Sequence, residues 1–156
     1  LPATTLATSC YQSMLGNCTS LTTTPVLPAT TLASGCYQGM LEGCTKLTTA
    51  PTLPSTTLAS SCYSGMFRLC TSLYKLPSLP ATTLADNCYK DMFSGCTNIK
   101  IATVLTGAYQ TAYRVPKTGT GVTATGALTD MFAGTGGVFT ASPAINTTYY
   151  AVNQVI

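Results

Sequence analysis

Residues 1–26 read LPATTLATSCYQSMLGNCTSLTTTPV, and the same unit starts again at Leu27, Leu53 and Leu79 with no insertion or deletion. A strict period of this kind is the signature of a repeat architecture, in which each unit packs mainly against its neighbours. One unit cannot bury its own apolar side, so we expect the units to be stable only when they are stacked. Residue 1 is already the first residue of a full unit, and we therefore expect the chain to be a piece of a longer protein.

Each unit is expected to contain a short helix. In the first unit, apolar residues recur every four positions: Leu6, Cys10, Met14 and Cys18. Further apolar residues stand beside them, which is typical of the buried stripe of a helix. Thr4 or Thr5 would cap its N-terminus. Glycines fall where such helices should end: Gly16, Gly43 and Gly95.

A short strand is expected at residues 21–24, ended by Pro25, which has no N–H to donate to a sheet. The proline recurs as Pro51 and Pro77, whereas the fourth unit has Thr103. Parallel strands stack roughly 4.8 Å apart, while packed helices need roughly 8–10 Å. A repeat with strands on one side and helices on the other must therefore curve, and we predict an open horseshoe with the strands inside.

The residues around the third unit resemble a known repeat family. The run CYSGMFRLCTSL at residues 62–73, followed by Leu79-Pro80, is similar to the Treponema-type, BspA-like leucine-rich repeat. That family has an Ala-Phe pair, a Cys three residues later and a Leu three residues after that. Met66-Phe67, Cys70 and Leu73 take these positions. The departures are a longer unit and different residues at three positions: Ala50, Leu76 and Cys62.

The resemblance covers residues 1–104 and implies an α/β leucine-rich-repeat solenoid, with short parallel strands on the concave side and short helices on the convex side. Within it, one column is expected to form the continuous core: Leu21, Leu47, Leu73 and Ile99. Such repeats serve many unrelated partners, so the resemblance says more about fold than about function.

The C-terminal third departs from the period. Residues 105–126 are rich in glycine and are predicted to be an inserted hairpin or loop. Residues 130–135 then echo residues 91–96 at an offset of 39, which places Val138 on the core position of Ile99. We interpret residues 127–156 as a degenerate capping repeat and a tail, with residues 145–152 lying across the end as a strand or irregular segment.

The composition excludes several classes of protein. Charged residues make up only 7% of the chain and the net charge is +3, which does not favour nucleic-acid binding. No run approaches the roughly 18 apolar residues of a membrane span. The sequence contains no signal peptide pattern. We expect no inserted membrane segment and no cofactor.

The eight cysteines form two columns, Cys10/Cys36/Cys62/Cys88 and Cys18/Cys44/Cys70/Cys96. In a helix, residues eight apart are separated by roughly 12 Å, beyond the roughly 7 Å that a disulfide spans between Cα atoms. Free, buried thiols are the favoured interpretation, with disulfides as the alternative. Zinc is disfavoured because there is neither a C-x-x-C pair nor a histidine.

Catalytic chemistry has few candidate residues. There is no histidine, and the carboxylates are Glu42, Asp86, Asp91 and Asp130. General acid–base catalysis usually needs a positioned histidine or a carboxylate pair, and a cysteine nucleophile needs a base. We therefore predict that the protein is not an enzyme.

Adjacent threonines recur once per unit: Thr4-Thr5, Thr30-Thr31, Thr56-Thr57 and Thr82-Thr83. Helix capping would explain one member of each pair. The alternative is a regular hydroxyl array that binds ice or a mineral-like lattice.

The concave face is the favoured binding site. Its candidate residues follow the core column in each unit: Thr22, Thr23, Thr48, Thr49, Tyr74, Lys75, Lys100 and Ile101. Hydroxyls in the first two units give way to an aromatic ring and two cations, which can stack on and hydrogen-bond a sugar or a peptide. The alternative is an ordinary solvated strand surface.

The resemblance implies a non-catalytic adhesion module on a bacterial cell surface, with a host or bacterial surface protein or a glycan as partner. A different hypothesis is a structural spacer or assembly component of a surface appendage or a phage virion, which would involve self-association. No nucleic-acid partner is expected.

Overall fold

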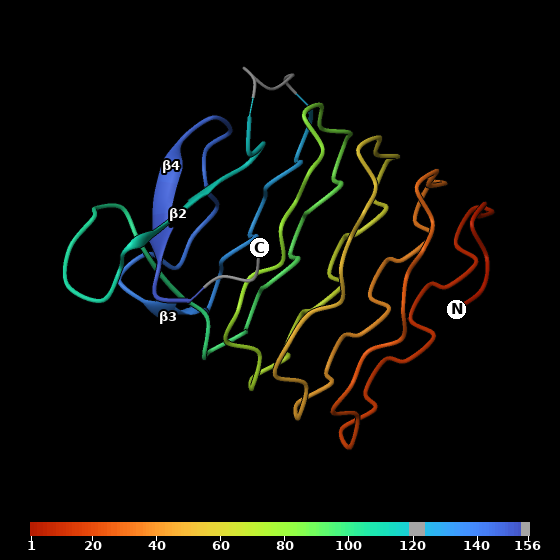
Figure 1. The fold of residues 1–156 in the computed structure, drawn as a ribbon, viewed down its shortest axis with the longest axis horizontal. Coiled ribbons are helices and arrows are strands. Elements are labelled where there is room, and N and C mark those ends of the chain that lie inside the picture. Colours follow the sequence, from red (N-terminus) through yellow and green to blue (C-terminus); the bar gives the residue numbers. More distant parts are fainter. Residues whose placement is uncertain (119–123, 154–156) are drawn as a thin grey trace.

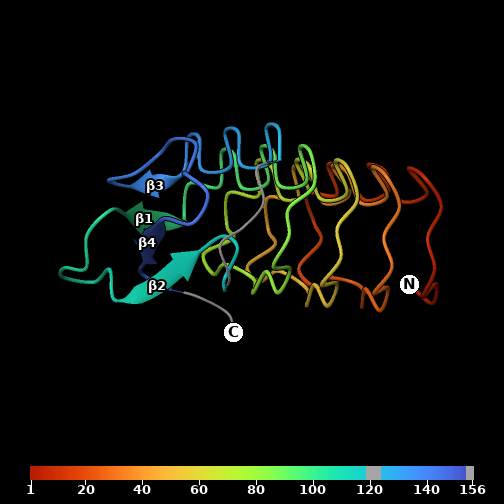
Figure 2. The ribbon, with the colours of Figure 1, turned by 90° about the horizontal axis from the view of Figure 1, so that it is seen from above.

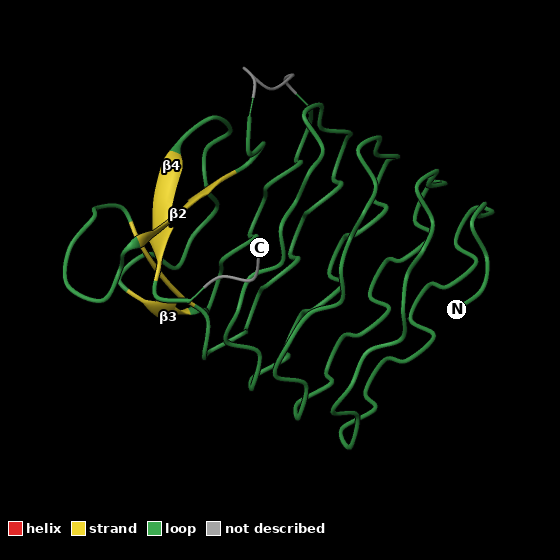
Figure 3. Ribbon diagram, in the orientation of Figure 1, coloured by secondary structure: helices red, strands yellow, loops and turns green. Residues whose placement is uncertain are grey.

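The computed structural model describes residues 1–118 and 124–153. The repeat units lie side by side as successive coils, and the C-terminal residues gather at the end of the stack opposite the first unit (Figure 1, Figure 2). Regular secondary structure in the described residues consists of four short strands and no helix (Figure 3). The strands are β1 (Lys100–Ala102), β2 (Thr111–Arg114), β3 (Gly136–Gly137) and β4 (Thr148–Ala151).

The predicted leucine-rich-repeat solenoid is therefore wrong. A horseshoe of that class needs a helix on the convex side and a strand on the concave side of every unit, and neither recurs in the described residues. The only sheet there is one small mixed sheet of order β2-β4-β1-β3, at the C-terminal end. The convex helices were the premise of the predicted curvature, so the horseshoe and its concave face are withdrawn with them.

The apolar stripe that suggested a helix forms a ladder of β-turns instead. We call this the turn ladder: residues 7–18, 33–44, 59–70 and 85–96 of the four units, and residues 124–135 after the insertion. Along it, N–H groups alternate between two acceptors. The Gln12 N–H donates to the Ser9 carbonyl three residues back, whereas the Tyr11 N–H donates to the Cys36 carbonyl of the next coil at 3.0 Å. The same alternation runs through the four 26-residue units.

Backbone conformation explains why no helix forms. Every fourth residue of the turn ladder has a positive φ: Ser9, Ser13, Asn17, Gly35, Gly39, Gly43, Ser61, Gly65, Leu69, Asn87, Asp91, Gly95, Gly126, Asp130 and Gly134. A right-handed helix does not accommodate a positive φ, which suits glycine and, less well, asparagine and aspartate. The spacing of four is thus the length of a turn repeat, and it was misread as the 3.6-residue period of a helix.

Side chains of the turn ladder are buried in adjacent pairs. In the second unit, Cys36 and Tyr37 are buried, as are Met40 and Leu41, whereas the intervening Gln38 reaches the surface. The opposite side of the core comes from the return segments, whose leucines are also buried: Leu27, Leu47, Leu53, Leu73, Leu76 and Leu79. Of the predicted core column, Leu47, Leu73 and Ile99 are confirmed as fully buried, and Leu21 of the first coil is half-buried.

Aromatic rings stack across the coils because each recurs at one position of the turn ladder. Tyr11, Tyr37, Tyr63 and Tyr89 form one column, with ring centroids 5.7 to 6.0 Å apart and planes within 8° of parallel. Phe67, Phe93 and Phe132 form a second column with similar separations. Parallel rings at these distances are favourable when they are offset.

Residues 124–135 pack on the fourth coil at the offset of 39 residues. The Phe93 N–H donates to the Met131 carbonyl, the Gly95 N–H donates to the Ala133 carbonyl, and the Phe93 ring stacks on Phe132. The register changes after Thr135, because Lys100 pairs with Gly136 in a parallel β1–β3 ladder. Val138 is 75% exposed, so its predicted core position is wrong.

Strands form only where the repeat ends. β1 occupies the positions at which the first three units have no strand, and it precedes Thr103, which replaces the recurring proline. The insertion, predicted at residues 105–126 as a hairpin or loop, contains β2, which pairs antiparallel with β4 of the tail. β4 also pairs antiparallel with β1, and it lies within residues 145–152, for which the prediction was a strand or an irregular segment.

The turn ladder predicts the sign of a glycine substitution. Gly65 has φ +60 and a Cβ built there would meet nothing within 4 Å, so Gly65→Ala tests the backbone conformation without a steric clash. We expect Gly65→Ala to lower the free energy of unfolding by about 1 kcal/mol, and Gly65→Asn to lower it less. Denaturant unfolding measures both. A helix at this position would give the opposite sign, because alanine stabilises a helix interior by about 1 kcal/mol relative to glycine.

The hydroxyls of two buried tyrosines, Tyr37 and Tyr113, offer a comparison of an unsatisfied group with a satisfied one. Tyr37 Oη has no hydrogen-bond partner among the described residues, whereas Tyr113 Oη donates to the Pro77 carbonyl at 3.3 Å. We expect Tyr37→Phe to raise the free energy of unfolding by about 1 kcal/mol and Tyr113→Phe to lower it by about 1 kcal/mol, as measured by denaturant melts. Equal effects of the two variants would show that Tyr37 Oη is satisfied.

Candidate binding surface

The residues predicted for the binding face are mostly at the surface. Thr22, Thr23, Thr48, Thr49 and Lys100 are exposed, Tyr74 is 38% exposed and Lys75 is half-buried. They occupy equivalent positions of successive coils and so recur along one side of the stack. Ile101 is the exception and its assignment is wrong: it lies in β1 and its side chain is fully buried, so it cannot contact a ligand.

Tyr74 and Lys75 form a small composite group in the third coil. The Lys75 ammonium lies 5.7 Å from the centroid of the Tyr74 ring, within the range of a cation–π contact worth about 0.5–1 kcal/mol at the surface. The Tyr74 N–H donates to the Thr48 carbonyl at 3.4 Å, which ties this segment to the second coil. The ring and the ammonium are thus held together on the surface.

A groove that the sequence interpretation missed is lined by residues that follow these positions along the chain. We call it the proline groove, and it is lined mainly by Pro25, Pro28, Pro51, Pro54, Pro77 and Pro80, together with Thr24, Thr52 and Ser78. It has two parts, of about 470 Å³ between the first and second coils and about 250 Å³ between the second and third. Pro51, Thr52 and Pro54 line both parts, so the groove is continuous over three coils.

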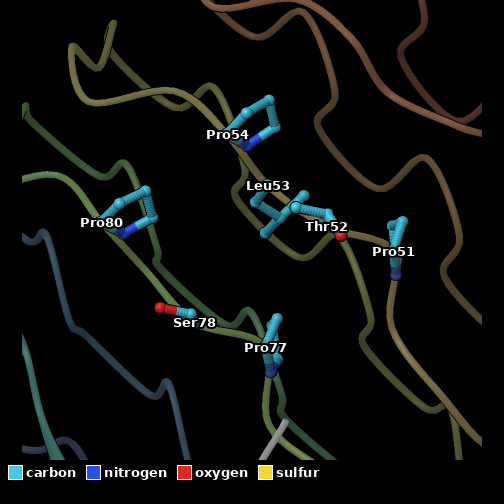
Figure 4. A pocket seen from close by; sticks show the side chains of 7 residues that line it. All are labelled: Pro51, Thr52, Leu53, Pro54, Pro77, Ser78 and Pro80. Atoms are coloured by element: carbon cyan, nitrogen blue, oxygen red, sulfur yellow. The ribbon is translucent and has the colours of Figure 1, made fainter. Parts of the chain in front are cut away.

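Figure 4 shows how the second part is formed. The segment carrying Pro51 and Pro54 runs beside the segment carrying Pro77 and Pro80. No backbone hydrogen bond between described residues joins 51–54 to 77–80. Proline has no N–H, so two prolines within four residues prevent a continuous strand ladder there. The recurrence of Pro25 as Pro51 and Pro77 is the signal that the sequence offers, although by itself it predicts only the end of a strand.

The threonine pairs form another repeating surface. Both members of each pair are exposed, and Thr31 is bridged in parallel to Thr5 on one side and to Thr57 on the other. Helix capping does not explain these pairs, because the described residues contain no helix. A shallow polar depression of about 460 Å³ lies between the third and fourth pairs. The hydroxyl-array hypothesis therefore stays an untested alternative.

The carboxylates mostly link neighbouring coils. Glu42 Oε1 lies 3.0 Å from Arg68 Nη1 of the next coil, a surface ion pair of small energetic value. Asp86 Oδ1 accepts the Thr125 N–H at 2.8 Å, and Asp130 Oδ1 accepts the Ser142 hydroxyl at 3.4 Å. None of these contacts brings two carboxylates together. The described residues also contain no cluster of histidine, cysteine, aspartate or glutamate that could hold a metal ion.

All eight cysteines are free thiols, six of them buried and two, Cys10 and Cys18, exposed. The free, buried thiols are thus confirmed for six, although the helical spacing used to exclude disulfides was wrong. In the second column each thiol of the later coils donates to a carbonyl of the preceding coil, as Cys70 Sγ does to Leu41 at 3.1 Å. Burial raises the pKa of Cys62 and of Cys70 to about 12 from the ordinary 9.0.

Raised pKa values predict a division of the thiols into two classes. The reactive species is the thiolate, and a thiol whose pKa is raised by burial is protonated and inaccessible at pH 8. We expect only Cys10 and Cys18 to react with a soluble thiol reagent at pH 8 in the native state. All eight should react after unfolding without reductant, as counted by mass spectrometry. A count below eight in denaturant would reveal disulfides and contradict the structure.

Comparisons with known proteins assign no family to this chain. No protein-family model, no curated protein and no solved structure matches it significantly. In the described part of the chain there is also no helix of the length and apolar character that a membrane crossing requires. The interpretation of this surface therefore depends on its own residues: a continuous proline groove and, beside it, the exposed threonines and the Tyr74–Lys75 pair.

Proposed function

We propose that this chain is a non-catalytic binding module that recognises a protein or a glycan through the proline groove and the exposed residues beside it. The observation that supports this most directly is the continuity of the groove over three coils. A groove that repeats with the coils suits a partner that is itself extended, because equivalent contacts recur along the stack.

The chemistry of the lining favours an extended chain over a small charged ligand. Proline rings offer rigid apolar faces, and the hydroxyls of Thr24, Thr52 and Ser78 offer hydrogen bonds. Tyr74 adds an aromatic face and Lys75 a cation at one end of this surface. Aromatic anchors surrounded by polar groups are typical of the energetically dominant part of a binding surface.

Catalysis is the less favoured alternative for physical reasons. The chain has no histidine, and its buried thiols have raised pKa values. The two exposed thiols, Cys10 and Cys18, have no histidine that could activate them as nucleophiles. We therefore propose that the protein is not an enzyme and needs no cofactor.

The proposed location is a bacterial cell surface. This part of the proposal rests on the resemblance of residues 62–73 to BspA-like repeats, in sequence motif and not in fold. The partner would then be a host or bacterial surface protein or glycan. An assembly role in a surface appendage or a virion is the second candidate, and the apolar first coil, where Met14 is 54% exposed, favours it.

A binding experiment tests the proposal. The purified chain is applied to a glycan array and to immobilised bacterial and epithelial surface proteins, and the affinity of each signal is measured. We expect Tyr74→Ala and Lys75→Ala to weaken binding about 5- to 30-fold, which corresponds to about 1–2 kcal/mol. Lys90→Ala is the matched control, because it removes a cation from the turn ladder on the other side of the coil. Binding that is insensitive to the first two variants, or equally sensitive to the control, would contradict the proposed surface.

A further inference from the structure

The two ends of the coil stack differ in how much of their core is covered by other residues of the chain. At the first coil, residues equivalent to core residues are uncovered: Met14 is 54% exposed whereas Met40 is fully buried, and Cys10 and Cys18 are exposed. The Tyr11 ring is stacked on one side only, by Tyr37. This face, made by the turn ladder of residues 7–18, is referred to below as the first-coil edge.

The first-coil edge carries a regular row of hydrogen-bond acceptors. In the second coil, five alternate carbonyls accept N–H groups from the first coil: Ser34, Cys36, Gln38, Met40 and Glu42. Their equivalents one period earlier accept no hydrogen bond from any described residue: Thr8, Cys10, Gln12, Met14 and Gly16. These five carbonyls are therefore equivalent to the carbonyls that accept hydrogen bonds between the existing coils of the chain.

A thiol donor completes the pattern. Cys44 Sγ donates to the Leu15 carbonyl at 3.2 Å, Cys70 Sγ to Leu41 at 3.1 Å, and Cys96 Sγ to Phe67 at 2.9 Å. Cys18 is the next member of this column and is exposed. The contact that its equivalents make would be supplied by a carbonyl lying across the first-coil edge.

Residues of the insertion and the tail pack on the opposite end of the stack. The Asp130 N–H, whose equivalents donate to a following coil, donates instead to Ser142 Oγ at 2.7 Å. Tyr113 and Phe139 meet the last stacked ring, Phe132, edge-on, with interplanar angles of 63° and 76°. Edge-on rings do not continue a parallel stack.

The hydrogen-bonding groups available at the two ends restrict what can occupy the first-coil edge. A second copy of the chain would have to present a row of N–H donors, and the middle donor of its row, the Asp130 N–H, is already bound to Ser142, while Tyr113 and Phe139 pack on Phe132 beside it. Two first-coil edges cannot pair with each other either, because both present only carbonyls along the row. The partner must present alternate N–H groups in the register of this repeat.

We propose that the first-coil edge is a docking surface for one more coil of the same 26-residue repeat, stacked in the parallel register seen between the existing coils. The docked coil donates alternate N–H groups to the carbonyls of the row from Thr8 to Gly16. Its aromatic ring covers Tyr11, and its carbonyl accepts the Cys18 thiol. This interaction is independent of the proposed binding function of the proline groove.

The test supplies the coil by fusion. A copy of residues 27–52 is joined directly ahead of Leu1, which preserves the period of 26. We expect the native-state modification of Cys10 and Cys18 at pH 8 to slow by about tenfold or more, since reaction would require local opening of the new interface. The midpoint of thermal unfolding should rise by several degrees. A fusion of the same composition in permuted order is the matched control, and it should change neither quantity.

Three outcomes would overturn the proposal. Unprotected Cys10 and Cys18 in the repeat fusion would show that the edge does not receive a coil. Equal protection by the permuted fusion would show that any apolar segment covers it. Protection of both thiols in the unfused chain, together with a dimer by light scattering, would show that the edge is occupied by a second copy.

Discussion

The stack depends on one constraint: half of the N–H groups of the turn ladder must point along the stack and not along their own chain. In a helix all N–H groups donate back to the same segment, and no backbone bond joins neighbouring units. Here the Tyr11, Tyr37, Tyr63 and Tyr89 N–H groups each donate to the following coil at 3.0 to 3.1 Å. A positive φ at every fourth residue makes this alternation possible, which is why glycine, asparagine, aspartate and serine recur in those columns.

The ladder also explains the composition of the core. Hydrogen-bonded coils are held in fixed register, so each buried position contacts its own equivalents one period away. A tyrosine column, a phenylalanine column and two cysteine columns follow from that register. Cysteine suits such a column because it is small, and its thiol can donate to the carbonyl of the preceding coil. Low charge is tolerated because the cohesion comes from backbone bonds and apolar contacts. Residues 1–118 and 124–153 form one ion pair, between Glu42 and Arg68.

The sequence predicted the repeat, its register and its degenerate last member, but not the local structure of a unit. Periodicity and the echo of residues 91–96 in residues 130–135 can be read from the sequence, and in the structure these two segments pack on each other. The helix was wrong because a spacing of four was treated as 3.6. Gly35, Gly39 and Gly43 stand at one interval of four and would cost a helix about 1 kcal/mol each, which was the available warning. The proline groove was missed because it depends on the distance between two coils, which the sequence of one unit does not contain.

The turn ladder and the return segment of a coil tolerate substitution to different degrees, and this difference indicates where the binding surface can vary. On the turn ladder, most positions have a positive φ, a buried side chain or an N–H group that donates to the next coil. Few residue types are therefore compatible with each of these columns. On the return segment, prolines interrupt the ladder and no backbone hydrogen bond joins residues 51–54 to 77–80. The leucines of this segment are buried in the core, and its exposed side chains are the ones that carry little of the stacking energy. The change from Thr22 and Thr23 in the first coil to Tyr74 and Lys75 in the third alters the surface chemistry without altering the ladder. A stack held by its backbone on one side leaves the other side free to carry a binding surface.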